Sequence, residues 1–154
     1  MTTINREPMS IDGAIQRGVA KYRITHADLT DADTSQTITL SDLALRGGSR
    51  VPAKARVEGA WYNVITAFAG GGNTAVVAKL GDAADDDELI TDVSIMATGI
   101  KPFSGAYTRG TYEAAYAPKV VVTTTDGTCL GLTAGVLEIF IEYSEITSTS
   151  LTRD

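Results

Sequence analysis

The chain of 154 residues, 44% of them hydrophobic, is long enough to bury one sizeable core, so we expect a single domain. A formal net charge of −6 argues against nucleic acid as a direct ligand, because phosphate binding depends on clustered Lys and Arg. The single cysteine, Cys129, excludes an internal disulfide, and no apolar run has the length of a membrane span. The first ten residues are polar and lack a secretory leader pattern, which predicts synthesis in a cytoplasm and no membrane partner.

The residue pattern over positions 1–18 predicts an extended N-terminal arm. Proline and glycine interrupt the segment, and its apolar side chains are too sparse to build a layer of a core. The same side chains would give a docked segment something to bury on a neighbour. The predicted partner-binding residues are Ile4, Met9, Ile11 and Ile15.

The next segments predict short strands separated by turns. Val19–Thr25 alternates in polarity and is the expected first strand, followed by an Asp-rich turn and a short strand over Gln36–Leu40. Ser41–Leu45 has an N-cap residue and one apolar turn before two glycines, which fits a single helical or 3₁₀ turn.

The central stretch, Val51–Leu80, contains two β-type runs joined by Gly70–Asn73. Glycine and asparagine tolerate positive φ, so this connection predicts a β-hairpin. The first run carries apolar groups on both faces, which indicates that one face meets the core and the other a partner layer or subunit. We expect Trp61 or Ile65 to be the core residue of this run.

The C-terminal half contains an acidic loop and further strands. Residues 88–97 fit a helix or a strand, with a strand favoured, and residues 98–118 predict a long covering loop with one short strand. A strand from Val120 and a turn at Asp126-Gly127 lead to a last strand of clear alternation. Its core-facing residues should be Leu137, Ile139, Ile141 and Tyr143, and its outward residues Glu138, Phe140 and Glu142.

About eight short β runs without a βαβ rhythm indicate an all-β fold, an antiparallel β-sandwich of jelly-roll type. An immunoglobulin-like topology is the alternative, weakened because no Cys pair flanks the tryptophan. The expected organisation is an arm over residues 1–18, a sandwich domain over 19–145 and a polar tail over 146–154.

No pattern in the sequence predicts a catalytic, metal or cofactor site. His26, Asp28 and Ser35 lack the Gly-x-Ser-x-Gly elbow of a hydrolase, so a surface turn is the better interpretation. The acidic run 82–88 has oxygen ligands that suit Ca²⁺ but not the spacing of an EF-hand, and a solvated loop is favoured. Gly70–Gly72 lacks the Lys-Ser/Thr of a phosphate-binding loop.

The aromatic residues allow a second interpretation, a sugar-stacking platform like those of sandwich lectins. We favour a core position for Trp61 over membership of such a platform, since a tryptophan in mid-strand is more often buried. The candidate platform residues are Trp61, Tyr62, Tyr107, Tyr112, Tyr116 and Phe140.

The order of features resembles a known class. These features are the polar arm, K-Y-R-I-T, T-I-T-L-S-D-L-A-L, A-W-Y-N-V-I-T-A-F-A before Gly-Gly-Gly-Asn-Thr, and G-L-T-A-G-V-L-E-I-F-I-E-Y. From Val19 to Tyr143 the chain is similar to the small jelly-roll structural proteins of tailed bacteriophages, which include capsid cement or decoration proteins. The resemblance implies a non-enzymatic virion protein on the outside of the head, often a trimer, whose arm crosses neighbouring major capsid subunits. It carries over no single functional residue.

The separation of acidic and basic residues along the chain is typical of a protein that associates with other copies or with a partner. Residues 82–92 are acidic without a basic residue, whereas 46–56 hold four basic residues, and opposite patches of this kind steer copies together. The expected partners are therefore the protein itself and the major capsid protein. Two rival functions remain, a tail or fibre module that binds host-surface glycan, and a depolymerase, for which paired carboxylates in a cleft would be needed.

Overall fold

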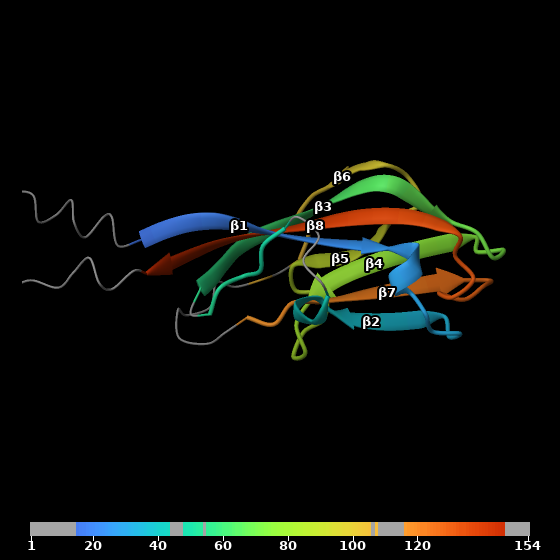
Figure 1. Ribbon diagram of the computed structural model, residues 1–154, viewed down its shortest axis with the longest axis horizontal. Coiled ribbons are helices and arrows are strands. Elements are labelled where there is room, and N and C mark those ends of the chain that lie inside the picture. The colour runs from blue at the N-terminus through green and yellow to red at the C-terminus, as the bar shows by residue number, and fades with distance from the viewer. Residues whose placement is uncertain (1–14, 44–47, 54, 106, 108–115, 147–154) are drawn as a thin grey trace, which may run out of the picture.

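The computed structural model describes residues 15–43, 48–53, 55–105, 107 and 116–146. These residues form eight antiparallel strands in two four-stranded sheets packed face to face, the β-sandwich that the sequence predicts (Figure 1). The strands are β1 (Ile15–Thr25), β2 (Ser35–Thr39), β3 (Ala55–Ala69), β4 (Ala75–Gly81), β5 (Ile90–Ser94), β6 (Gly99–Lys101), β7 (Lys119–Thr125) and β8 (Ala134–Ile146).

The strand order is that of a jelly roll. One sheet has the order β1-β8-β3-β6 and the other β2-β7-β4-β5. The pairs β1/β8, β2/β7, β3/β6 and β4/β5 are all antiparallel, as in a long hairpin rolled up on itself. Every connection except β4 to β5 therefore crosses from one sheet to the other.

Strand β1 begins at Ile15, earlier than the predicted Val19. It pairs with β8 without a register shift from Ile15↔Ile146 to Thr25↔Val136, so the two strands at the chain ends leave the sandwich side by side (Figure 1). Of the predicted partner-binding residues, Ile4, Met9 and Ile11 lie outside the described residues. Ile15 is the first residue of β1.

The predicted hairpin at Gly70–Asn73 is wrong, although the turn chemistry is right. Gly70, Gly71 and Gly72 have φ of 116°, 64° and 74°, conformations that favour glycine. The strands that they join, β3 and β4, lie in opposite sheets and pair with β8 and β7 instead. The turn is therefore a corner between the two layers of the sandwich.

The core lies between the sheets, and the predicted core face of β3 is wrong. Tyr62 is buried opposite Ile139, whereas Ile65 is 45% exposed and Trp61 is only partly buried. Trp61 pairs with Phe140, which the alternation of β8 places on the outer side. The buried cluster includes Ala20, Tyr22, Ile24, Val57, Tyr62, Val64, Phe68, Val76, Leu80, Val120, Val122, Leu137, Ile139 and Ile141.

The described residues between the strands include two short helical turns. Two 3₁₀ turns, η1 (His26–Asp28) and η2 (Leu40–Asp42), flank β2, and the second lies where the sequence predicts a turn. β6 is the short strand predicted within residues 98–118, and β5 confirms a strand in residues 88–97. In the described residues, no helix is long and apolar enough to span a membrane.

Candidate interaction surface

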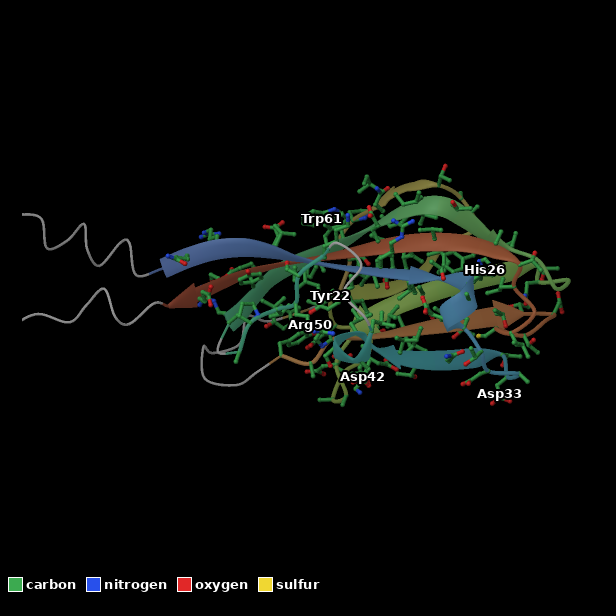
Figure 2. All side chains as sticks on the ribbon, viewed as in Figure 1. Tyr22, His26, Asp33, Asp42, Arg50 and Trp61 are labelled. Atoms are coloured by element: carbon green, nitrogen blue, oxygen red, sulfur yellow. The ribbon has the colours of Figure 1, made fainter. Side chains whose placement is uncertain are left out.

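A row of stacked side chains crosses the outer face of sheet β1-β8-β3-β6. Lys21, Phe140 and Trp61 are cross-strand neighbours on β1, β8 and β3. The Trp61 and Phe140 rings are parallel within 8°, with centroids 5.1 Å apart, and Lys21 Nζ lies 5.9 Å from the Phe140 centroid. Figure 2 shows Trp61 on the side of this sheet that faces away from β2, β7 and β4. An apolar surface flanked by a cation is a common anchor for a binding partner.

Carboxylates on the same face are held by local partners. Lys21 Nζ lies 2.8 Å from Glu138 Oε2, and the Glu138 side chain is only 11% exposed. Toward the start of β3, Glu58 Oε2 accepts hydrogen bonds from Ser144 Oγ at 2.6 Å and Arg56 Nε at 3.1 Å. Because these carboxylates are paired with bases and donors, they act as fixed, largely neutralised groups around the aromatic row.

Apolar side chains extend the row into a patch. Val19 is 45% exposed, Ile65 45% and Ile100 61%, on β1, β3 and β6 of the same sheet. We call Val19, Trp61, Ile65, Ile100 and Phe140 the aromatic patch. The outer face of the other sheet differs, because it is formed mainly by Thr37, Thr39, Val77, Lys79, Lys119, Val121 and Thr123. Exposed apolar groups that lie together on one face are typical of interaction sites, so this face is the candidate interaction surface.

The acidic loop between β4 and β5 is a compact turn. Asp82 Oδ1 accepts hydrogen bonds from the backbone N–H groups of Ala84 and Asp85, both at 2.9 Å, which folds the loop back on itself. Lys79 Nζ lies 3.1 Å from Asp86 Oδ2, a contact that raises the pKa of the lysine.

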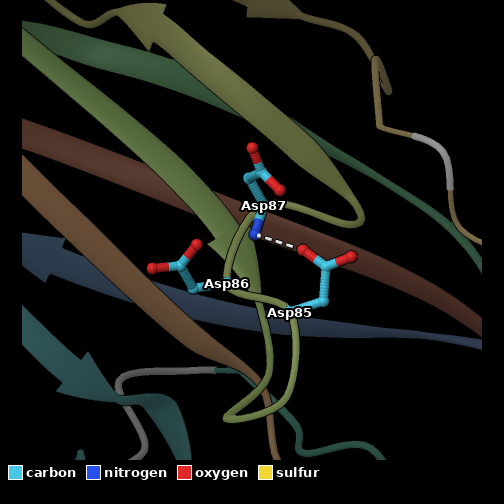
Figure 3. A group of neighbouring side chains, drawn as sticks. All are labelled: Asp85, Asp86 and Asp87. Carbon is cyan, nitrogen blue, oxygen red and sulfur yellow. Dashed lines mark hydrogen bonds between the residues drawn. The ribbon is translucent and has the colours of Figure 1, made fainter.

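Within this loop, Asp85, Asp86 and Asp87 bring one carboxylate oxygen each within 4.8 Å of the others (Figure 3). Asp87 N–H donates to Asp85 Oδ1 at 3.4 Å, and the interaction with the Asp85 side chain raises the pKa of Asp87. The hydrogen bond with the Asp85 side chain is the main cause of this shift, and repulsion from the Asp85 and Asp86 carboxylates adds to it. No metal site is assigned to these exposed carboxylates.

Asp28 and Ser35 take structural roles, whereas Nδ1 of His26 is buried without a hydrogen-bond partner among the described residues. The Asp28 carboxylate accepts the Thr25 N–H at 2.8 Å, which caps the 3₁₀ turn that contains His26. Ser35 Oγ lies 3.4 Å from Thr123 Oγ1 on the neighbouring strand β7. In the candidate triad, the Asp28 carboxylate and the Ser35 hydroxyl are therefore each hydrogen-bonded to another residue.

Two of the candidate platform tyrosines pack inward instead. Tyr107 and Tyr116 contact each other edge to face at 6.2 Å and lie against the core cluster. Tyr116 Oη donates to Glu88 Oε1 at 2.7 Å, and burial raises the pKa of both groups. Tyr62 is buried in the core, and Tyr112 lies outside the described residues. Among the described residues, the candidate platform is therefore limited to Trp61 and Phe140.

The sequence places Phe140 correctly on the outer face but misses its partner Trp61. The signal was present in β8, whose strict alternation makes Phe140 the outward residue opposite Trp61 once the two strands are paired.

No family model matches this chain, and no curated protein matches it either. Among solved structures, the chain is similar to a chain of the cyanophage Pam1 capsid asymmetric unit, with a TM-score of 0.58 and 12% sequence identity. The match covers 86% of each chain. At this identity the comparison shows a common fold over nearly the whole domain.

Proposed function

We propose that this protein is a non-enzymatic structural component of a phage virion, and specifically a cement or decoration protein on the outside of the head. The proposal rests above all on the fold shared with a chain of a cyanophage capsid asymmetric unit over 86% of both chains. The order of sequence features from Val19 to Tyr143 points to the same class.

The chemistry of the described residues supports a binding role. The outer carboxylates Glu58 and Glu138 are neutralised by neighbouring groups, and Asp28 caps a turn. The aromatic patch offers apolar contact area to a partner. A protein that binds only the assembled head stabilises it by an amount that grows with the logarithm of its free concentration relative to its Kd, which is the thermodynamic basis of a cement protein.

The proposed partners are the protein itself, with a trimer favoured, and the major capsid protein. Residues 1–14 and the start of β1 supply Ile4, Met9, Ile11 and Ile15 as the apolar contacts of a clamp across neighbouring capsid subunits. The proposed location is the capsid surface of the virion, after synthesis in the host cytoplasm.

Co-sedimentation with undecorated heads tests this function. The full chain should sediment with heads to saturation, raise the temperature at which the heads rupture, and appear as regular density on their outer surface by electron microscopy. Free capsid protein that has not assembled serves as the control. A chain that stays in the supernatant at all concentrations would rule out the cement role.

A tail or fibre module that binds host-surface glycan is the second candidate, favoured by the stacked Trp61 and Phe140 rings on an exposed face. Glycan binding predicts retention of the full chain on host-surface polysaccharide and its loss in Trp61→Ala. Retention on heads with no retention on polysaccharide would reject this candidate.

A further inference from the structure

The aromatic patch is a partly apolar face without a cover among the described residues. Ile100 is 61% exposed and Val19 and Ile65 are each 45% exposed, around the Trp61 and Phe140 rings. Removing such side chains from water is favourable in proportion to the apolar area buried, so a matching apolar segment would be held there.

We propose that residues 1–14 of a second copy of this chain lie across the aromatic patch, with Ile4, Met9 and Ile11 against Trp61, Ile65 and Ile100. This arm-to-sheet contact deepens the self-association part of the proposed function, on which it rests, and names the surface that carries it. It needs no capsid.

The length of the segment fits the contact. Residues 1–14 precede β1, a strand of the same sheet, and 14 extended residues reach about 46 Å at about 3.3 Å per residue. Ile15 pairs with Ile146, and Trp61 with Phe140, so the patch lies 146 minus 140, or six, residues along β8 from that end. Six residues of strand span about 20 Å, which leaves length to cross between two molecules.

The direction of β1 favours a second copy over the same molecule. From Lys21, beside Phe140, the chain runs back to Ile15 away from the aromatic row, paired with β8 throughout. Figure 1 shows the N-terminal end of β1 directed away from the body of the sandwich, and hence away from the patch of its own molecule. An arm that binds the face of the next copy is a heterologous contact, which closes into a ring when the rotation allows.

The single tryptophan of the chain, Trp61, reports on this contact directly. Tryptophan emission and acrylamide quenching are measured on the full chain across a dilution series, with mass followed by sedimentation velocity. Emission should shift to the blue and quenching should fall as concentration rises, in step with the growth in mass.

The matched variant is the full chain with Ile4→Ser, Met9→Ser and Ile11→Ser. It should keep the far-ultraviolet circular dichroism of the parent and stay monomeric, with red-shifted, quenchable emission at every concentration. A synthetic peptide of residues 1–14 should restore the blue shift in this variant, and the same peptide with the three serines should not. Ile65→Ser on the sheet should weaken the response to the peptide.

Emission that does not change with concentration overturns the proposal. If Trp61 is shielded even at high dilution, the arm covers its own sheet. If Trp61 stays exposed in a solution where the chain associates, another surface joins the copies. The measurement contains no heads, so its failure is distinct from a failure of head binding.

Discussion

Two buried tyrosines on the inner face of the same sheet differ in what their hydroxyl groups contact. Tyr22 Oη accepts the backbone N–H of Val51 at 2.9 Å, which fastens residues 48–51 beside β1. The Tyr62 hydroxyl is fully buried without a hydrogen-bond partner among the described residues, and burial raises its pKa well above 10.0. A buried donor without a hydrogen-bond partner lowers the free energy of unfolding, and removing the donor restores that stability.

Removing each hydroxyl should therefore have opposite effects. Tyr62→Phe should raise the free energy of unfolding by about 1 to 2 kcal/mol, and Tyr22→Phe should lower it by about 1 to 2 kcal/mol because the Val51 N–H loses its acceptor. Urea unfolding of both variants followed by circular dichroism checks the pair. Destabilisation by Tyr62→Phe would mean that its hydroxyl is hydrogen-bonded.

The raised pKa of the Glu88 carboxyl leads us to expect that stability depends on pH. Burial raises its pKa above the ordinary 4.5, an effect partly offset by the hydrogen bond from Tyr116. A carboxyl whose pKa is raised by folding binds its proton more tightly when folded, so its ionisation opposes folding. This penalty is absent below 4.5 and complete above the raised value, so the contribution of Glu88 to stability is lost as pH rises.

Acidification from about pH 7 to about pH 5 should therefore raise the thermal midpoint of the Glu88→Gln variant by less than it raises the midpoint of the parent protein. The side-chain oxygen of the introduced glutamine can still accept the Tyr116 hydrogen bond, which separates charge from packing. Glu142→Gln, on the exposed face of β8, is the control for loss of one negative charge. Equal midpoint gains in the parent and in Glu88→Gln would refute the assignment.

At the scale of elements, the corner between β3 and β4 depends on its glycines for two separate reasons. Gly71 and Gly72 both have left-handed φ, 64° and 74°. A Cβ on Gly71 would lie 2.6 Å from the carbonyl oxygen of Gly131, whereas one on Gly72 would meet nothing within 4 Å. A side chain at either position would strain the backbone, but only a side chain at Gly71 would also collide with a neighbouring residue.

Gly72→Ala should cost about 1 kcal/mol, the strain of a left-handed residue, and Gly71→Ala about 1 to 3 kcal/mol more from the backbone collision with Gly131. Chemical denaturation of the two variants measures the difference. Equal costs would show that the β7–β8 loop, which contains Gly131, moves aside freely.

The same corner explains what the sequence could and could not predict. Local residues determine a turn, so the positive φ of Gly70–Gly72 was predictable, but the sheet to which β4 belongs depends on its pairing with β7. Likewise β3 is apolar on both faces, and only its register against β8 decides that Tyr62 points in and Trp61 out. β8 itself alternates cleanly, and its core face was correct at Leu137, Ile139 and Ile141.

At the scale of the whole molecule, the rolled topology brings both ends of the domain to one place. β1 and β8 are adjacent along their whole length, and Ile15 pairs with Ile146. Arm and tail therefore start from the same end of the sandwich, while His26 and Asp33 lie toward the other end (Figure 2). A protein with this layout can attach through its chain ends and leave the opposite loops facing outward.

Two truncations should separate attachment from folding. Deleting residues 1–14 leaves every β1–β8 pair in place, so circular dichroism and the thermal midpoint should match those of the full chain. Deleting residues 1–18 also removes the pairs from Ile15↔Ile146 to Gly18↔Tyr143 and should cost roughly 1 to 4 kcal/mol, since cross-strand pairs contribute about 0.2 to 1 kcal/mol each.

Both truncations should lose self-association and bind heads weakly, because both lack the apolar side chains Ile4, Met9 and Ile11. Ordering such a segment costs about 1 to 2 kcal/mol per residue in backbone entropy, so only a partner that supplies hydrogen bonds and apolar contacts can fix it. Co-sedimentation with undecorated heads and sedimentation velocity measure the two losses. A folded 15–154 chain that binds heads as tightly as the full chain would exclude the arm from the clamp, and an unfolded one would make it part of the core.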